Sequence, residues 1–297
     1  METGGHGGTD GGGRTSWGDL LVEARRRLAG PEHPSFEAEE LLARATGRPR
    51  RWFLARRREE ATPADAAAFR DLVARRAAGE PLQYLLGEWE FLGRTFRVDP
   101  RALIPRGETE GIVEVSREQA PSACRILDVG TGSGVLAVTL ALERPGCTVL
   151  ALDRSPAALA LARENAVRHG VGGRVRLLAS DWLSALRPGT PFDLVVANPP
   201  YVPLAEAPHL SKTVSEHEPP LALYGGEDGL DGVRAILRSL PPFVSPGAPF
   251  VFEFGYGQAR AVSDLVEDSG AFRLAAVRLD AAGIPRTATA VRSAAGG

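Results

Sequence analysis

The tetrapeptide Asn198-Pro199-Pro200-Tyr201 combines residue types that can hold a planar –NH2 group. It follows directly after the apolar run 192–197, which is typical of a buried strand. The two prolines lack an N–H and fix φ, so their carbonyls can point into a cleft. The Asn198 side-chain oxygen and the Pro199 carbonyl can then accept the two hydrogens of the –NH2 group, while Tyr201 packs over its plane. We therefore predict Asn198, Pro199 and Tyr201 as catalytic residues, and Asn198, Pro199, Pro200 and Tyr201 as the acceptor-binding site.

A glycine loop supplies the candidate residues for a cofactor. Glycines stand at every second position of the run Gly130-Thr131-Gly132-Ser133-Gly134, which follows a predicted strand at 125–129. Such a loop lets a ligand approach the backbone and the N-terminus of the next helix closely. Many nucleotide-binding proteins share this feature, but the GxGxG spacing differs from the GxGxxG of dinucleotide sites.

Two further strand ends carry groups suited to adenosine. Asp153 ends the second predicted strand and can accept hydrogen bonds from both ribose hydroxyls; a helix-capping role is the alternative, but Ser155 already fills it. Asp181 and Trp182 follow the third strand, where the indole can cover the adenine and the carboxylate can accept from its amine. Trp182 can instead be a core residue. This order of groups resembles class I methyltransferases, and the resemblance implies S-adenosylmethionine as the cofactor.

Methyl transfer to an amide or amino nitrogen fits this set of residues. An amide nitrogen is a poor nucleophile, whereas a sulfonium methyl is already activated, so the protein must mainly align the two. Near-attack positioning is worth roughly 7–11 kcal/mol at best, and accepting hydrogen bonds from the N–H groups raises the electron density on nitrogen. We predict no metal site, and we expect His209 and His217 to be loop residues rather than catalytic bases.

The elements that must position these groups alternate between strands and helices after residue 106. The pattern predicts strands at 125–129, 148–152, 175–179, 194–197 and 249–254, helices at 135–143 and 156–169, and late strands at 272–278 and 288–292. Such alternation indicates an α/β fold with a doubly wound, mostly parallel sheet of seven strands, similar to a Rossmann fold.

The first third of the chain has a different rhythm. Residues 17–79 follow a helical period, with predicted caps at Ser35 and Thr62 and stops at Gly47 and Gly79. The second helix is predicted to carry Phe36, Leu41 and Leu42. We predict a disordered tail over 1–15, a helical substrate-recognition domain over 16–80, a β-hairpin connector over 81–106 and a methyltransferase domain over 107–297.

Composition limits the classes of function. The 297 residues carry a formal net charge of −2, which argues against strong non-specific binding to DNA or to an anionic membrane. No apolar run is long enough to span a bilayer and no secretory signal is visible, so we predict a cytoplasmic protein. The two cysteines, Cys124 and Cys147, lie near the starts of adjacent predicted strands; we expect ordinary thiols, and a disulfide between them is conceivable but not expected in a reducing cytosol. A basic cluster at 48–58 is either a solvated helix face or a docking surface for a partner that works on RNA.

Several further motifs bring a closer resemblance. They are the runs 81–87, 91–93, 103–110, 218–219 and 221–231. With the tetrapeptide 198–201, they resemble the signatures of the HemK/PrmC family of protein-glutamine N5-methyltransferases, from about residue 17 to the end. The resemblance implies an S-adenosylmethionine-dependent enzyme that methylates the glutamine of the Gly-Gly-Gln loop in class 1 peptide chain release factors, and so takes part in translation termination.

The resemblance also assigns residues by position. The implied cofactor contacts are Gly130, Thr131, Gly132, Ser133, Gly134, Asp153, Asp181, Trp182 and Asn198, and Arg106, Thr109 and Glu110 are implied at the methionine end. Two positions depart from the family pattern. Gly107 stands where the family usually has proline, and Pro220 replaces a common arginine.

Alternatives stay open at this point. A methyltransferase for a ribosomal-protein glutamine is a close relative with the same chemistry. A DNA adenine or cytosine amino-methyltransferase shares the tetrapeptide, but the near-neutral charge and the absence of a sequence-reading domain disfavour it. We expect a monomer that binds its release factor and does not bind DNA or a membrane directly.

Overall fold

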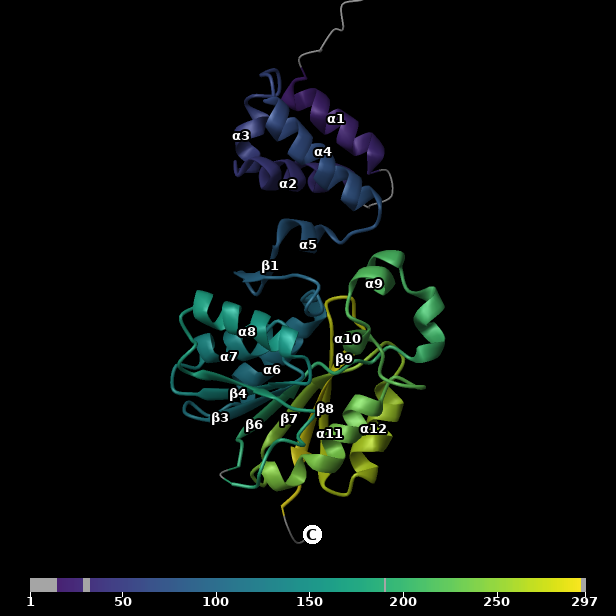
Figure 1. Cartoon of the computed structure of the whole chain (residues 1–297). Coiled ribbons are helices and arrows are strands. Elements are labelled where there is room, and N and C mark those ends of the chain that lie inside the picture. The colour runs from purple at the N-terminus through teal and green to yellow at the C-terminus, as the bar shows by residue number, and fades with distance from the viewer. Residues whose placement is uncertain (1–14, 29–32, 190, 295–297) are drawn as a thin grey trace, which may run out of the picture. The chain divides into compact units, whose positions relative to one another are not determined.

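The computed structural model describes residues 15–28, 33–189 and 191–294 (Figure 1). The chain divides into two compact units, residues 1–86 and 87–297, and each is described by itself below. The predicted tail over 1–15 lies outside the described residues except for Thr15.

The smaller unit is helical. Its helices are α1 (Trp17–Arg27), α2 (Pro34–Thr46), α3 (Arg50–Leu54), α4 (Pro63–Ala77) and α5 (Leu82–Leu86). They enclose a core that includes Trp17, Leu20, Leu41, Leu42, Phe53 and Phe69. The predicted cap at Thr62 is confirmed, since its side chain accepts a hydrogen bond from the backbone N–H of Asp65.

One prediction for α2 is wrong. The helix begins at Pro34 rather than after Ser35, because proline is tolerated in the first helical turn, where its missing N–H is not needed. Phe36 is 39% exposed, and the guanidinium of Arg50 lies over its ring, 4.8 Å from the centroid. The predicted end at Gly47 is confirmed by its left-handed φ of 67°.

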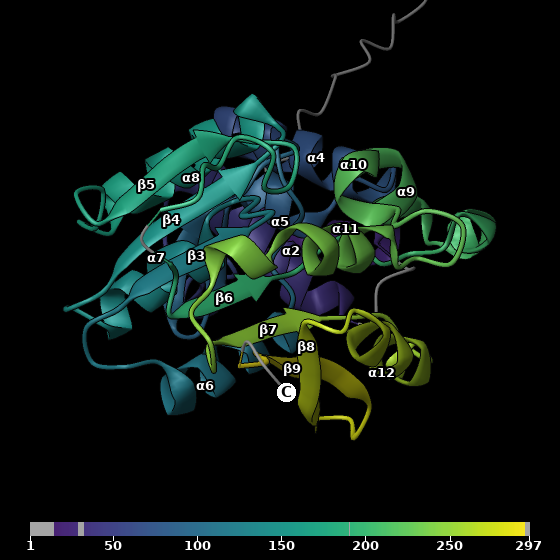
Figure 2. The ribbon, with the colours of Figure 1, turned by 90° about the horizontal axis from the view of Figure 1, so that it is seen from below.

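The larger unit contains a two-stranded hairpin and a seven-stranded sheet. Figure 2 shows the strands of the larger sheet side by side, from β5 at one edge to β8 at the other. The hairpin pairs β1 (Glu88–Phe91) with β2 (Arg94–Arg97). The sheet has the order β5-β4-β3-β6-β7-β9-β8, in which β9 runs antiparallel to both of its neighbours and the other pairs are parallel. Its strands are β3 (Arg125–Val129), β4 (Thr148–Asp153), β5 (Val175–Ala179), β6 (Leu194–Ala197), β7 (Pro249–Glu253), β8 (Phe272–Leu279) and β9 (Pro285–Arg292). The predicted fold class is confirmed.

Alternating side chains build a separate core on each face of this sheet. On β3, Ile126 joins the core beneath α6 (Glu110–Gln119), α7 (Val135–Glu143) and α8 (Pro156–Arg168). The next residue, Leu127, joins the core beneath α11 (Asp231–Ser239) and α12 (Ala259–Asp268). The remaining elements are short: η1 (Gly107–Thr109), η2 (Leu204–His209), α9 (Lys212–His217), α10 (Pro220–Leu223) and η3 (Pro241–Phe243). These elements, like α6, α11 and α12, were not predicted.

A disulfide joins Cys124 and Cys147, whose Cα atoms are 4.6 Å apart. The prediction of two ordinary thiols therefore differs from the structure. The reason is the strand register: Arg125 on β3 lies opposite Thr148 on β4, so the residues just before them come side by side. Among the helices of the described residues, none has the length and apolar character needed to cross a membrane.

Candidate active site

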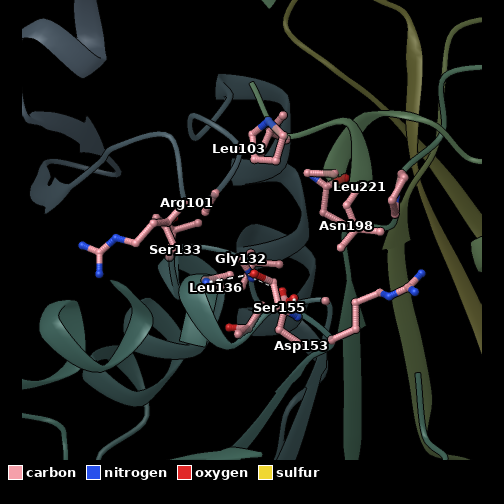
Figure 3. Close-up of a pocket in the computed structure, with 18 of the residues that line it drawn as sticks. Arg101, Leu103, Gly132, Ser133, Leu136, Asp153, Ser155, Asn198 and Leu221 are labelled. Carbon is pink, nitrogen blue, oxygen red and sulfur yellow. Dashed lines mark hydrogen bonds between the residues drawn. The ribbon is translucent and has the colours of Figure 1, made fainter. Parts of the chain in front are cut away.

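The glycine loop and the Asn-Pro-Pro-Tyr corner leave the sheet at the same edge. β3 and β6 are neighbours, and Val129 lies directly opposite Ala197. Gly130 and Asn198, the next residues, therefore face one cavity. Figure 3 shows Gly132 of the loop and Asn198 in the lining of this cavity. The predicted site residues that line it are Gly130, Thr131, Gly132, Ser133, Asp153, Asp181, Trp182, Asn198 and Pro200. Groups for a cofactor and for an acceptor thus share one space.

Backbone contacts hold the glycine loop in its cradle shape. The N–H groups of Gly130 and Thr131 both donate to the Leu152 carbonyl at the end of β4, at 2.8 Å. Gly134, with a φ of 84°, starts α7, and a Cβ there would lie 3.0 Å from the Cβ of Ala162 on α8. Gly134 does not line the cavity; it lets the two helices pack closely.

Asp153 links the loop to the next strand end. Its carboxylate accepts from the N–H of Gly132 at 2.9 Å and from the N–H of Ser155 at 2.8 Å. Each oxygen keeps a lone pair with which it can bind a ligand hydroxyl. Burial raises the pKa of Asp153, because desolvation penalises its charged form. The predicted cap at Ser155 is confirmed, since its hydroxyl accepts from Ala158 N–H.

Asp128, the residue before the last one of β3, is a buried carboxyl that the sequence interpretation left without a role. Thr131 donates its hydroxyl proton to Asp128 Oδ2 at 2.6 Å. Burial raises the pKa of Asp128 to about 7, and hydrogen bonds from Thr131 and from the backbone of Ala137 oppose this. This carboxyl therefore holds the glycine loop in place through the Thr131 hydroxyl.

Trp182 both lines the cavity and packs on the core. Its φ of 49° is unusual for a residue with a side chain and turns the indole after β5. Gly232 on α11 makes room for it, since a Cβ there would lie 2.8 Å from the indole Cη2 and 2.9 Å from the Cβ of Pro199. Asp181 also lines the cavity; its side chain is 64% exposed and lies 3.9 Å from the Arg154 guanidinium. An adenine-sized ring could therefore meet an indole face and a carboxylate at this strand end.

A chain of hydrogen bonds runs behind Asn198. Its Nδ2 donates to Thr109 Oγ1 at 2.9 Å, and Thr109 Oγ1 donates to Glu253 Oε2 at 2.7 Å. Thr109 and Glu253 are 3% and 0% exposed. Since its amide nitrogen is engaged by Thr109, Asn198 has its oxygen left for a ligand in the cavity.

Tyr201 points into the protein rather than over the cavity. Its ring lies against Gly255, where a Cβ would come within 3.2 Å of Cδ2. Burial and the neighbouring Glu253 carboxyl raise the pKa of the phenol. Neither Tyr201 nor Pro199 lines the cavity, so the predicted packing of Tyr201 over a planar acceptor is not what the structure shows. Asn198 and Pro200 are the corner residues that reach it.

The backbone of the corner rests on a second glycine-rich loop, residues 225–229. A Cβ on Gly225 would lie 2.3 Å from the Pro200 carbonyl oxygen, and one on Gly229 would lie 2.2 Å from the Tyr201 carbonyl oxygen. Gln258 then ties the two segments together, donating to the carbonyls of Tyr201 at 2.9 Å and Asp228 at 3.1 Å. Residues far apart in sequence thus fix the corner.

Of the three residues implied at the methionine end, two line the cavity. These are Arg106 and Thr109. Glu110 instead accepts a hydrogen bond from the backbone N–H of Leu92 at 2.9 Å, so it supports the hairpin. Arg106 forms an ion pair with Glu218, which is 1% exposed at its side chain and also accepts from Ile104 N–H at 3.1 Å.

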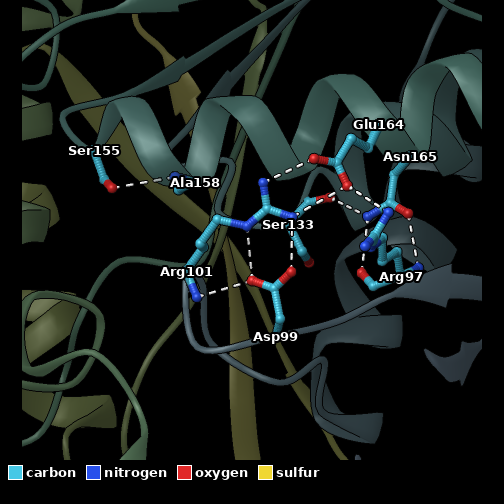
Figure 4. A network of polar contacts seen from close by, with 8 residues as sticks. All are labelled: Arg97, Asp99, Arg101, Ser133, Ser155, Ala158, Glu164 and Asn165. Carbon is cyan, nitrogen blue, oxygen red and sulfur yellow. Dashed lines mark hydrogen bonds and ion pairs between the residues drawn. The ribbon is translucent and has the colours of Figure 1, made fainter. Parts of the chain in front are cut away.

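The segment after the hairpin is fastened to α8 (Figure 4). Asn165, fully buried, accepts from the N–H of Arg97 at 2.8 Å and donates to the carbonyls of Arg97 and Ser133 at 3.0 and 2.8 Å. Arg101 bridges Asp99 and Glu164, each with contacts of 2.8 Å or shorter. One helix therefore braces both the glycine loop and the strand that leads to the cavity wall.

The basic cluster at 48–58 makes contacts within the smaller unit. Arg50 donates to Glu39 at 2.8 Å and to Glu40 at 3.1 Å. The guanidinium groups of Arg48 and Arg56 lie over the Trp52 ring, 4.5 and 4.7 Å from its centroid. These contacts give the cluster a role in packing, and its predicted docking role stays a prediction.

Glu253 and Gln258 support the site but were not predicted as site residues. Glu253 is the last residue of β7, an otherwise apolar strand in which every residue is buried. An acidic residue at the carboxyl end of a fully buried strand is a signal for a polar site, because a charge is rarely buried there without a partner.

Comparisons with known proteins agree with this geometry. The family model described as the PrmC N-terminal domain matches residues 19–87, and the model described as the methyltransferase small domain matches residues 112–214. A release factor glutamine methyltransferase from Moorella thermoacetica is 46% identical over 276 residues, which cover 92% of this chain and 97% of the relative. One from Geobacter sulfurreducens is 44% identical and covers 81% of this chain and 84% of the relative.

Solved structures show the likeness in fold. A methyltransferase from Pyrococcus furiosus aligns with a TM-score of 0.53 at 14% identity, covering 74% of this chain and 98% of that one. The catalytic domain of hMettl16 aligns with a TM-score of 0.55 at 15% identity, covering 75% and 82%. At such identities the shared feature is the sheet and its helices.

Proposed function

The chain belongs to the family of release factor glutamine methyltransferases, and from this premise we propose that it methylates the side-chain amide nitrogen (N5) of the glutamine in the Gly-Gly-Gln loop of class 1 peptide chain release factors. The methyl donor is S-adenosylmethionine. The observation that carries the proposal is the single cavity, in which Asp153 and Trp182 lie with Asn198.

The residues present fit the cofactor. We assign the ribose to Asp153, the adenine to Trp182 and Asp181, and the remainder to the glycine loop 130–134 and the cavity wall near Arg106. Left-handed glycines in this loop leave no Cβ to block a close ligand. When bound, S-adenosylmethionine supplies a methyl group activated by a sulfonium.

The protein's part in the reaction is to hold and orient the nitrogen. We assign the Asn198 side-chain oxygen, which reaches the cavity, as the acceptor for an amide hydrogen of the substrate. A nitrogen held in this way keeps its face turned to the donor, and positioning of this kind is worth roughly 7–11 kcal/mol at best. Accepting this hydrogen bond also stabilises the positive charge that develops on nitrogen.

A mass-spectrometric experiment tests the assignment. A class 1 release factor is incubated with the protein and isotopically labelled S-adenosylmethionine, and the methylated residue is located by fragmentation. We expect one methyl group on the glutamine of the Gly-Gly-Gln loop. Transfer to ribosomal protein or to duplex DNA, with none to release factor, would contradict the proposal in favour of one of the related activities.

We also propose that the protein acts in the cytoplasm as a monomer and does not bind DNA directly. The support is its proposed substrate, a translation factor, and its net charge of −2, which offers little for binding a polyanion. Light scattering coupled to gel filtration would check the monomer, and a mobility-shift titration with duplex DNA would check the absence of binding.

A further inference from the structure

We propose that Glu253, at the end of β7, is a positioning residue that fixes the orientation of the Asn198 amide through the hydroxyl of Thr109. The proposal rests on the function assigned above, because it matters only if Asn198 binds the acceptor nitrogen. The three side chains form a continuous chain, with Asn198 Nδ2 to Thr109 Oγ1 at 2.9 Å and Thr109 Oγ1 to Glu253 Oε2 at 2.7 Å.

The chemistry of the three groups gives this chain a direction. An ionised carboxylate only accepts, so the single hydroxyl proton of Thr109 must go to Glu253. The lone pairs left on Thr109 Oγ1 then accept from an N–H, which selects the NH2 end of Asn198. The oxygen end of that amide is thereby left for the cavity that Asn198 lines. An acceptor is what an incoming –NH2 group requires.

The opposite polarity would block the reaction. If Glu253 carried a proton and donated it to Thr109, the hydroxyl could donate onward to the Asn198 oxygen. The amide would then present its own NH2 to the substrate NH2, and two donors would meet. The charge state of a carboxyl that never touches the substrate therefore decides which end of the asparagine the substrate meets.

The surroundings of Glu253 determine its charge state and so the direction of the hydrogen bonds. The carboxyl is 0% exposed, so water does not compete for it. Thr109 donates to Oε2, the Tyr201 hydroxyl is a further polar neighbour, and the charged neighbours are Glu108, within η1, and Arg286, on β9. Burial raises the pKa of Glu253, with Glu108 adding to the rise, while Thr109, Tyr201 and Arg286 lower it. As the pH falls through this raised pKa, Glu253 becomes protonated and methyl transfer should be lost.

The test compares variants in the full-length protein with a purified release factor and S-adenosylmethionine. Glu253→Gln keeps the shape but replaces a group that only accepts with one that both accepts and donates, so the direction of the chain is no longer fixed. We expect kcat to fall about tenfold or more, which corresponds to 1.4 kcal/mol or more in the barrier, while the KM for S-adenosylmethionine changes less than about threefold. The acidic limb of the pH–rate profile should disappear in this variant.

Thr109 variants test the relay. Thr109→Val removes the hydroxyl at nearly the same volume and should lose a similar factor in kcat, whereas Thr109→Ser should recover most of the rate. Combining Thr109→Val with Glu253→Gln should cost little more than either change alone, because both break one chain. Thr289→Val, which removes a buried hydroxyl on β9 outside this chain, is the matched control and should keep the wild-type rate.

Two outcomes would overturn the proposal. One is a Glu253→Gln variant with the wild-type rate or the wild-type acidic limb. The other is additive losses in the double variant, accompanied by equal losses in thermal stability, which would indicate a structural role alone. Failure of the proposed function is a separate result, since the wild-type protein would then leave the release-factor glutamine unmethylated.

Discussion

The two halves of the active-site cavity are supported in different ways. The cofactor half, the glycine loop with Asp153, is held by residues on the strands and turns next to it, such as the Leu152 carbonyl and the Asp128 carboxyl. The acceptor half is held by side chains and loops from distant parts of the chain. Its hydrogen bond between Thr109 and Glu253, for instance, joins residues 144 positions apart.

This difference indicates how the two halves respond to change. A locally supported loop can be altered without disturbing the corner, and a change in the corner's support should leave cofactor binding intact. Separate effects on S-adenosylmethionine affinity and on methyl transfer are therefore the main expectation of the comparison.

The largest effect is expected from Asn198→Ala. It removes the oxygen that we assign to the acceptor nitrogen, so kcat should fall by about 100-fold or more, in line with the removal of one preorganised hydrogen-bonding group in other active sites. The affinity for S-adenosylmethionine should stay within about threefold, because the glycine loop and Asp153 do not depend on the Asn198 side chain for their shape. Steady-state kinetics and calorimetric titration measure the two quantities; a variant that retains most of its activity would refute the acceptor assignment.

Asp153→Ala should give the reverse pattern. Loss of the carboxylate removes the proposed ribose contacts and frees the N–H groups of Gly132 and Ser155. We expect the Kd for S-adenosylmethionine to rise about 10- to 100-fold, or about 1.4–2.8 kcal/mol, with kcat at saturating cofactor reduced only a few-fold. If kcat fell as far as it does in Asn198→Ala, the two halves would not be separable.

Gly229→Ala is the sharpest test of remote support. The added Cβ would lie 2.2 Å from the Tyr201 carbonyl oxygen, at a φ of 82°. Overpacking of this kind costs about 1–3 kcal/mol, and the corner must move to relieve it. We expect the rate of methyl transfer to fall by about tenfold while cofactor affinity is unchanged. Gly283→Ala, which adds a Cβ at a similar φ of 77° but meets nothing within 4 Å, is the matched control.

The smallest effect concerns stability on the cofactor side. Burial raises the pKa of Asp128 to about 7, so the folded protein holds a proton there that the unfolded chain releases at lower pH. This contribution favours folding at low pH and is lost as the pH rises from about 4 towards 7. Asp128→Asn should flatten that decline, which thermal unfolding between pH 5 and 8 would measure. An unchanged pH dependence would show that Asp128 does not carry the proton.

The same contrast explains what the sequence could and could not predict. The glycine loop, Asp153 and the corner each follow an apolar strand directly, and strand order then brings them together by register. Glu253 and Gln258 support the corner only through the folded chain, so spacing in the sequence gives no sign of their partners. The prediction for Tyr201 failed for the same reason. The ring points into the protein, where its hydroxyl lies near the Glu253 carboxyl and its edge contacts Gly255.

Two smaller predictions, the helix cap at Ser35 and the free cysteines, failed for separate reasons. Ser35 has the right residue type for a cap, but the preceding proline already starts the helix. The two cysteines do lie at the starts of adjacent strands, as predicted, and the disulfide was not expected because a reducing cytosol was assumed.

The loop with Gly225 and Gly229 also bears on how this protein could be redesigned. Its main-chain atoms, rather than side chains, form the floor under Pro200 and Tyr201. Because backbone atoms form this contact, no side chain can be shortened there, and a substitution cannot enlarge the site for a bulkier methyl acceptor. Altered selectivity would have to come from the rim, where Leu221, Ala222 and Tyr224 line the cavity and can be exchanged without moving the backbone beneath.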